Sequence, residues 1–261
     1  PHQKSIIVKA LQSKGHQVAM TGDGVNDVIA LREADCSITL PEANDAAKQV
    51  SQIVLLNEDF SVLKDVLMEG RRVVNNLTNV ARIFFIKTIY SVLLSLFCIL
   101  TNTAFPFIPI QITLIDLAIE AYTSLFISFE ANSKPVKGVF LHTVLRNAAP
   151  FAFVIMINII FLTFMAPVLN IAQGPLVTIM YLLIGFVSIL AVLEVCIPFN
   201  KLHAFLFSTT FVGFFTAVYL FRDLLQITSI NTRELGIFII FAIISTIILT
   251  IKQKIYKKIG Y

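Results

Sequence analysis

Near the start of the chain, a short apolar run ends in Met20-Thr21-Gly22-Asp23-Gly24-Val25-Asn26-Asp27, which contains two glycines, two carboxylates and one amide. Glycine allows the backbone to turn tightly or to approach a ligand closely. A hard cation such as Mg²⁺ binds one or two carboxylates together with water and phosphate oxygens. The same residue types also form ordinary surface turns, so the letters alone leave a magnesium–phosphate loop and a plain turn open.

The residues around this turn predict alternating strands and helices. Apolar residues at helical spacing predict helices over 5–11, 25–33 and 44–50. Short apolar or alternating runs predict strands over 17–20, 36–40 and 53–56. Such alternation is typical of a parallel sheet covered by helices, of which about 60 residues supply only a part. Ligands of open α/β sheets lie beyond the carboxyl ends of the strands, which is where Thr21–Asp27 falls, so the functional interpretation is favoured.

The remainder of the chain has the composition of a membrane protein. The 261 residues are 57% hydrophobic and only 14% charged, unlike an average soluble domain. A helix that crosses a bilayer needs about 20 apolar residues. Six segments meet that requirement, at about 80–101, 106–128, 147–169, 175–197, 204–221 and 235–251.

Basic residues dominate every second loop between these segments. They flank the first span (Arg71, Arg72, Arg82), follow the second (Lys134, Lys137, Arg146) and the fourth (Lys201, His203), and fill the C-terminal tail (Lys252, Lys254, Lys257, Lys258). The loops after the first and third spans contain none. Since basic loops stay on the cytosolic side, both ends of the chain are expected in the cytosol. The formal net charge of +4 therefore reports topology, and no nucleic-acid partner is expected.

Residues 59–79 interleave apolar and charged positions and predict an amphipathic helix that runs into the first span. Such a helix is either a lever that carries motion into the bilayer or a simple connector. The three cysteines, Cys36, Cys98 and Cys196, have no metal-ligand spacing and indicate no disulfide framework. No signal peptide is visible and the chain opens on Pro1, so a piece of a longer protein is expected.

Ionisable residues within the spans are few, and they predict an ion site. Asp116 and Glu120 are four residues apart, which places both on one face of the second span. Glu194 lies near the end of the fourth span and Lys87 in the first. A charge in mid-bilayer costs about 3 kcal/mol or more, so such groups usually face a pathway and have partners. Oxygen ligands suit Ca²⁺ or Mg²⁺, and Thr113, Thr123 and Ser124 add hydroxyl oxygens on or near the same span. Two other interpretations stay open: the acids could form polar contacts between helices, and Lys87 could extend its ammonium group to the membrane surface.

Several motifs resemble the C-terminal part of a P-type ATPase. They are Pro1-His2-Gln3-Lys4, the Met20–Asp27 stretch, Ala34-Asp35, Ile53-Val54-Leu55-Leu56 and Glu69-Gly70-Arg71-Arg72. The resemblance implies a partial phosphorylation domain of the haloacid-dehalogenase fold over 1–58, a stalk helix over 59–79 and an all-α membrane domain of six helices over 80–261. In that family ATP phosphorylates an aspartate in a separate DKTGT motif, which this sequence does not contain.

Site residues follow from the same resemblance. Lys4 is expected to contact the transferred phosphoryl group, and Asp23 to bind Mg²⁺. Asn26 and Asp27 would complete the metal and phosphate surroundings, with Thr21, Gly22 and Gly24 in the same loop. Because phosphoryl transfer depends on neutralising and positioning charge, a cation and a lysine suit that role.

The membrane half is similar to calcium pumps of the family. The segment Ile110–Glu120 resembles their ion-binding sixth helix, and Leu193–Cys196 resembles the eighth-helix segment that supplies an acid. Thr88 and Ser91 stand where those pumps have an amide and an acid, and Lys87 where proton–potassium pumps have a lysine. This departure leaves room for about one divalent ion.

The resulting hypothesis is the C-terminal part of an ATP-driven cation pump, with Ca²⁺ export favoured and Asp116, Glu120 and Glu194 as cation ligands. Alternatives are a pump for H⁺, K⁺, Mg²⁺ or Mn²⁺ and a non-catalytic ion-binding or regulatory membrane protein. Mg²⁺ and ATP are the expected cofactors, with ATP bound mainly by an N-terminal remainder of the polypeptide. The expected location is a bacterial cell membrane, and the present chain is expected to be inactive by itself.

Overall fold

The computed structural model describes residues 2–56, 59, 61–136 and 138–258. Pro1 and Lys137, which entered the motif and loop predictions, and the side chain of Lys257 lie outside the described residues. The chain forms two compact units, Pro1–Leu67 and Met68–Tyr261, and each is described by itself.

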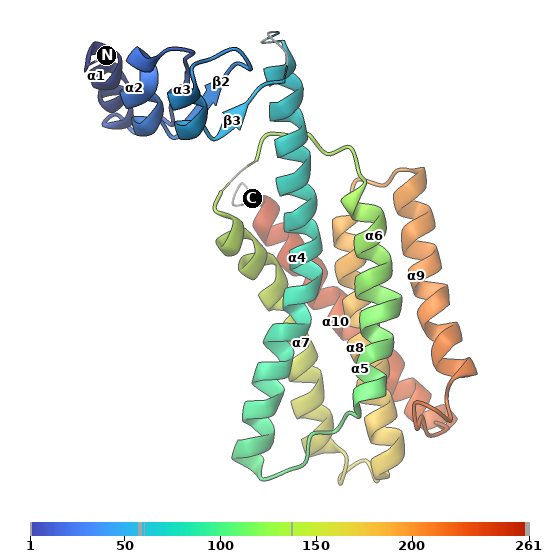
Figure 1. Cartoon of the computed structure of the whole chain (residues 1–261). Coiled ribbons are helices and arrows are strands. Elements are labelled where there is room, and N and C mark those ends of the chain that lie inside the picture. Colours follow the sequence, from blue (N-terminus) through green and yellow to red (C-terminus); the bar gives the residue numbers. More distant parts are fainter. Residues whose placement is uncertain (1, 57–58, 60, 137, 259–261) are drawn as a thin grey trace. The chain divides into compact units, whose positions relative to one another are not determined.

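The first unit contains a small parallel sheet with helices between its strands (Figure 1). Its elements are α1 (His2–Gln12), β1 (Ala19–Thr21), the 3₁₀ turn η1 (Val25–Asp27), α2 (Val28–Glu33), β2 (Cys36–Thr39), α3 (Asp45–Val50) and β3 (Ile53–Val54). The strand order is β1-β2-β3, with both pairs parallel. Ala19 lies opposite Cys36, and Ile38 opposite Ile53. The predicted alternation of strands and helices is confirmed.

The helix expected over 25–33 begins with a tighter turn than the periodicity predicts. The amide of Asp27 donates to the carbonyl of Gly24 at 3.0 Å, which is a bond of the 3₁₀ type. The regular α2 starts only at Val28. Its Ala30 and Leu31 are buried, and Leu31 packs with Ala47 in the small core of this unit.

The second unit is a bundle of long apolar helices. Among the described residues, six helices are long and apolar enough to cross a membrane, which confirms the predicted number. They are α4 (Val62–Thr101), the continuous stretch α5 (Pro109–Ile115), η2 (Asp116–Ala121) and α6 (Tyr122–Ser128), then α7 (Phe140–Met165), α8 (Gln173–Val195), α9 (Lys201–Leu220) and α10 (Thr232–Lys258). The chain is therefore a multi-pass membrane protein.

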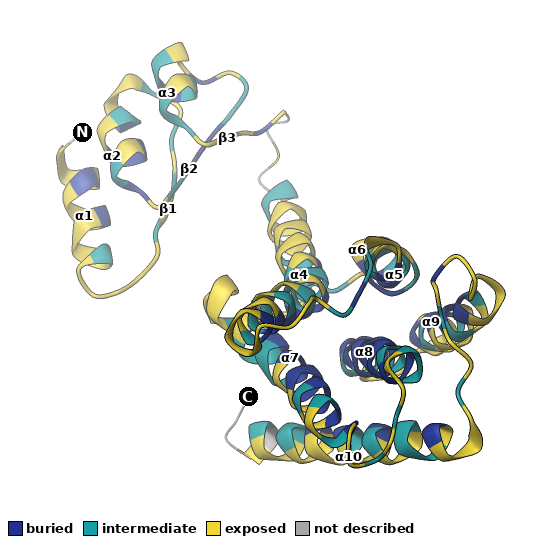
Figure 2. Ribbon diagram, turned by 90° about the horizontal axis from the view of Figure 1, so that it is seen from below, coloured by how far each residue is buried: buried dark blue, intermediate teal, exposed yellow. Residues whose placement is uncertain are grey.

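Helix α8 occupies the centre of this bundle. Figure 2 shows it as the most buried ribbon, with α5, α7, α9 and α10 around it. Of its apolar window, 72% is buried, more than in any of the other five spans described. Gly185 of α8 allows this close packing, because an added Cβ would overlap the ring of Phe214 in α9. In addition, Asn158 of α7 donates to the hydroxyl of Ser245 in α10 at 2.9 Å.

Several helices extend beyond the predicted spans. Helix α7 begins at Phe140 instead of 147, and α10 continues to Lys258 instead of ending at 251. Apolar composition marks the part of a helix that suits the bilayer, whereas backbone hydrogen bonding continues through flanking polar residues such as His142 and Lys254. For the same reason the predicted stalk and the first span belong to one helix, α4.

Candidate functional site: a lysine–aspartate turn and an intramembrane carboxylate pair

The first candidate site lies where β1 ends. Lys4, on α1, places its Nζ 2.6 Å from Oδ1 of Asp27, at the end of η1. Asp27 is only 5% exposed, whereas the Lys4 side chain is largely open to solvent. The hydrogen bond from Lys4 holds the pKa of Asp27 below its usual value of 3.8, against the opposing effect of burial. The structure thus brings together two of the predicted residues, 23 positions apart.

Gly22 is required by the close approach of the turn to Asp27. A Cβ added at Gly22 would lie 2.6 Å from Cβ of Asp27, too close for any other residue without a shift. The turn is fixed from the other side by two bonds. The hydroxyl of Thr39 donates to the carbonyl of Gly22 at 2.6 Å, and the amide of Asn44 donates to the carbonyl of Asp23 at 2.8 Å.

The remaining predicted residues of this turn are open to a ligand. Thr21, Asp23 and Asn26 are exposed, and Gly24 is half-buried. No group of three or more acidic, histidine or cysteine side chains suited to a metal occurs in the described part of the chain. Mg²⁺ usually takes only one or two carboxylates and completes its shell with water and phosphate. Asp23 and Asp27 supply two carboxylates within one turn, a number that fits such a shared site.

The second candidate site lies within the membrane spans. Nζ of Lys87 on α4 is 2.6 Å from Oδ1 of Asp116 and 3.4 Å from Oε2 of Glu120. The Glu120 side chain is 3% exposed, and that of Asp116 40%. Both acids belong to η2, a π-helical stretch within the second span. π-Helical stretches are rare in proteins, and those that occur are often found at functional sites. The structure brings three of the predicted residues, Lys87, Asp116 and Glu120, into one charged cluster.

Hydroxyl groups around this cluster have different roles. Thr88, Thr113 and Thr123 donate to backbone carbonyls one turn earlier in their own helices, to Phe84, Pro109 and Ile119 respectively. Ser91 is half-buried on α4. By contrast, three buried oxygen atoms have no hydrogen-bond partner among the described residues: Oη of Tyr90, Oε2 of Glu120 and Oγ of Ser124.

Tyr90 was not predicted from the sequence. A tyrosine in an apolar span is usually a packing residue, and the available signal was its place three residues after Lys87, on a neighbouring position of the same helix face.

Glu194 has a different set of partners. Its Oε1 accepts from Nη2 of Arg82 at 2.7 Å and from Nζ of Lys252 at 2.9 Å. Its Oε2 accepts from Lys252 at 2.9 Å and from Nε2 of Gln253 at 3.0 Å. These four bonds match the roughly four acceptor positions of a carboxylate. The structure therefore ties Glu194 to α4 and α10, and binding of an ion by Glu194 requires its release from these partners.

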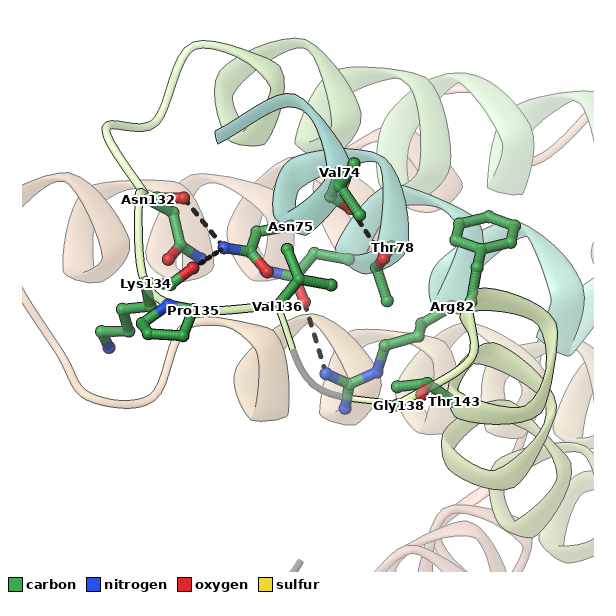
Figure 3. A pocket seen from close by; sticks show the side chains of 12 residues that line it. Val74, Asn75, Thr78, Arg82, Asn132, Lys134, Pro135, Val136, Gly138 and Thr143 are labelled. Carbon is green, nitrogen blue, oxygen red and sulfur yellow. Dashed lines mark hydrogen bonds between the residues drawn. The ribbon is translucent and has the colours of Figure 1, made fainter. Parts of the chain in front are cut away.

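A pocket of about 670 Å³ lies where α4, the segment after α6 and the start of α7 meet (Figure 3). Arg82 lines it together with Thr78 and Thr143. Figure 3 also shows how α4 holds the neighbouring segment, since Nδ2 of Asn75 donates to the carbonyls of Asn132 at 3.0 Å and Lys134 at 2.9 Å.

Asn76 makes a second pair of such bonds, to the carbonyls of Ser128 at 3.2 Å and Glu130 at 2.8 Å. The carboxylate of Glu130 in turn lies 3.1 Å from Nε2 of His203, whose Nδ1 faces the carbonyl of Pro198 at 3.0 Å. Two successive asparagines of α4 thus fix the segment 128–134.

Comparison with known proteins finds cation-transporting ATPases as relatives. No family model matches the chain. A probable cation-transporting ATPase, exp7, of Streptococcus pneumoniae is 39% identical over 269 residues, which cover 99% of this chain and 34% of that protein. The calcium-transporting ATPase CtpE of Mycobacterium bovis is 42% identical over 165 residues, covering 59% of this chain and 21% of CtpE. A calcium-transporting ATPase of Bacillus subtilis is 34% identical over 131 residues, covering 50% and 15%. The chain spans about a third of the length of the first of these relatives, and the matches cover less of the other two.

Proposed function

This chain corresponds to the C-terminal part of cation-transporting P-type ATPases, and from that premise we propose that it forms the ion-carrying part of an ATP-driven pump for Ca²⁺. The transported ion is held by Asp116 and Glu120, and the energy comes from phosphorylation of an aspartate outside this chain.

The observation that carries the proposal is the cluster of Lys87, Asp116 and Glu120 inside the spans. A buried carboxylate in a bilayer is costly, and such groups mark ion pathways by default. Carboxylate oxygens are the ligands that Ca²⁺ prefers. Lys87 neutralises part of their charge, so a cation that enters must compete with its ammonium group. This competition favours one divalent ion per site.

Two of the relatives are named as calcium-transporting ATPases, whereas exp7 is named only as cation-transporting. These names support Ca²⁺ as the transported ion. The presence of a fixed lysine within the site favours, as the second candidate, a pump for another cation among H⁺, K⁺, Mg²⁺ and Mn²⁺.

The turn after β1 supplies the second half of the proposal. Lys4 and Asp27 hold each other in place, and the exposed Asp23 belongs to the same turn as Asp27. When bound here, Mg²⁺ supplies positive charge to the phosphoryl oxygens. Lys4 adds a second positive charge, and Gly22 lets the backbone carry Asp23 past the Asp27 side chain. Phosphorylation moves the pump between two states only if the ion binds them with different affinity.

The test is vanadate-sensitive ATP hydrolysis by the complete transporter that contains this chain, measured against a panel of cations. We expect Ca²⁺ to stimulate hydrolysis most strongly. Asp116→Asn removes one ligand charge and is expected to raise the half-maximal concentration of Ca²⁺ by about tenfold or more, which corresponds to about 1.4 kcal/mol. Asp223→Asn is the control, because this carboxylate is exposed in the loop after α9.

Stimulation by another cation alone would select the second candidate. If no cation stimulates ATP hydrolysis, the alternative of a non-catalytic ion-binding or regulatory protein is favoured. If Asp116→Asn responds to Ca²⁺ as the unaltered protein does, Asp116 is not part of the site.

Lys87 has its own test in the same assay. Lys87→Ala leaves the two carboxylates without their internal cation, so the ion stoichiometry or the pH dependence of transport is expected to change. If both stay as in the unaltered protein, Lys87 has no part in the site.

A further inference from the structure

Tyr90 lies on the buried face of α4. It continues the row of buried residues Ile83, Ile86 and Leu94 and follows Lys87 by three positions. Its side chain is 0% exposed. The phenol therefore lies inside the bundle, in the same part of α4 as the lysine that binds Asp116 and Glu120.

The hydroxyl of Tyr90 has no hydrogen-bond partner among the described residues. A buried tyrosine hydroxyl normally finds a partner, because an unpaired buried polar group costs about 1 to 3 kcal/mol. Tyr181 on α8 shows the ordinary case. It is also 0% exposed, and its hydroxyl donates to the carbonyl of Gln111 at 3.0 Å.

Helix spacing relates Tyr90 to the carboxylate site: Tyr90 lies three positions after Lys87 on the same face of α4, and Nζ of Lys87 contacts Asp116 and Glu120. Oε2 of Glu120 is itself buried and without a hydrogen bond from the described residues, although Nζ of Lys87 lies 3.4 Å away. Two buried oxygen atoms without a hydrogen bond from the described residues thus belong to neighbours of Lys87, Tyr90 by helix spacing and Glu120 by direct contact.

We propose that the Tyr90 hydroxyl is a neutral oxygen ligand of the cation held by Asp116 and Glu120. Ca²⁺ takes six to eight oxygen ligands, and two carboxylates supply at most four. Lys87 has three donors and no acceptor, so it cannot supply any of the remainder. The ligands of the cation then come from both α4 and η2, and the cation is the partner that the Tyr90 hydroxyl otherwise lacks. The inference rests on the proposed function of this site.

The matched pair of variants Tyr90→Phe and Tyr181→Phe tests the proposal in the complete transporter. Each removes one hydroxyl from a fully buried ring and keeps its packing. For Tyr90→Phe we expect the half-maximal Ca²⁺ concentration for ATP hydrolysis to rise about fivefold to tenfold, as for the loss of one strong oxygen contact. Tyr181→Phe should lower the unfolding temperature and leave the half-maximal concentration unchanged.

A second measurement does not depend on turnover. The rise in unfolding temperature on addition of Ca²⁺ is measured within each variant, so a change in basal stability cancels. We expect this rise to be smaller at a given Ca²⁺ concentration in Tyr90→Phe and unaltered in Tyr181→Phe.

A different response of Tyr90→Phe would overturn the inference. If the hydroxyl is only an unsatisfied group in the core, Tyr90→Phe becomes more stable, and its response to Ca²⁺ equals that of the unaltered protein. That outcome overturns the inference and leaves the proposed function standing. If no cation stimulates the unaltered transporter or raises its unfolding temperature, the proposed function itself fails.

Discussion

Three buried or half-buried carboxylates have three different surroundings, and these determine what each can do. Asp27 has one lysine at 2.6 Å. Glu194 has four hydrogen bonds from three side chains. Glu120 has a lysine only at 3.4 Å. Of the three, Glu120 has the longest contact with a partner and a buried oxygen atom without a hydrogen bond from the described residues, so it is the best placed to bind a cation.

Asp27 gives a prediction about pH. Its pKa in the folded protein is lowered, first by the hydrogen bond from Lys4. The pair therefore stabilises the fold at pH values above the unfolded pKa of about 3.9, and this contribution is lost as the pH falls through the lower folded value. Lys4→Met should destabilise the protein at pH 7 by about 1 kcal/mol or less, because Lys4 is largely exposed.

The measurement is thermal unfolding of the unaltered chain and of Lys4→Met between pH 7 and pH 3. The two unfolding temperatures should converge below pH 4. Lys9→Met is the control, since Lys9 lies on the same helix and forms only an exposed pair with Glu33 at 3.1 Å. A difference between Lys4→Met and the unaltered chain that stays constant across this range would contradict the assignment.

Single residues were predictable from the sequence where local spacing determines their placement. Asp116 and Glu120 share a helix face because they are four residues apart, and both indeed meet Lys87. The partners of Glu194 were not predictable, because Arg82 lies 112 positions and Lys252 58 positions away. Tyr90 was missed because its unusual feature is an absent partner among the described residues, which no letter of the sequence reveals.

At the scale of helices and strands, periodicity predicted which elements exist and failed at their ends. The strand–helix alternation over 1–60 and the apolar spans depend on residues close together in the sequence. Element ends depend on individual backbone bonds, as in the 3₁₀ turn at Val25–Asp27. The π-helical η2 was not predicted, since its extra residue per turn becomes visible only when the backbone bonds are known.

Glu194 links three helices, and its removal should loosen all three. Glu194→Gln keeps the shape of the side chain but leaves Arg82 and Lys252 without their carboxylate. Breaking a buried pair in this way costs about 3 kcal/mol or more. We therefore expect a clear fall in unfolding temperature in detergent. The exposed Asp223→Asn is the control and should change little.

The same variant separates two roles of Glu194. A helix-linking role predicts lost stability with an unchanged half-maximal Ca²⁺ concentration in the complete transporter. A raised half-maximal concentration with little loss of stability would instead identify Glu194 as a cation ligand.

The contact between α8 and α9 depends on one glycine. In Gly185→Ala the new methyl group would overlap the ring of Phe214, which is itself fully buried. Overpacking of this kind usually costs about 1 to 3 kcal/mol. Gly213→Ala in α9 is the matched control, since no atom lies within 4 Å of its added Cβ. It should be neutral or slightly stabilising, because alanine favours helix more than glycine does. Equal unfolding temperatures for the two variants would exclude this packing argument.

For the whole molecule, the number of spans was predictable because the apolar length of a segment is a local property. The central place of α8 follows from its apolar residues on all sides, which suit a helix enclosed by others. Which helices surround it was not predictable from one sequence, because neighbours are selected by shape at contacts such as Gly185 with Phe214.

The orientation of the whole chain in the membrane can be tested directly. The alternation of basic loops predicts that both ends of the chain are cytosolic. In a background without Cys36, Cys98 and Cys196, a cysteine at Thr103 should react with a membrane-impermeant maleimide applied to intact cells. A cysteine at Val136, which is exposed in the next loop, should react only after the cells are permeabilised. Labelling of both in intact cells would overturn the predicted orientation.

The two asparagines of α4 have a consequence for how this protein can vary. Asn75 and Asn76 bind the carbonyl oxygens of residues 128, 130, 132 and 134, and none of these bonds involves a side chain of that segment. Every amino acid carries the same carbonyl, so the segment can exchange many of its side chains over evolutionary time and still be anchored. Constraint is concentrated on the two amides instead. Among related proteins, we therefore expect the asparagine pair to persist while the residues that it holds diverge.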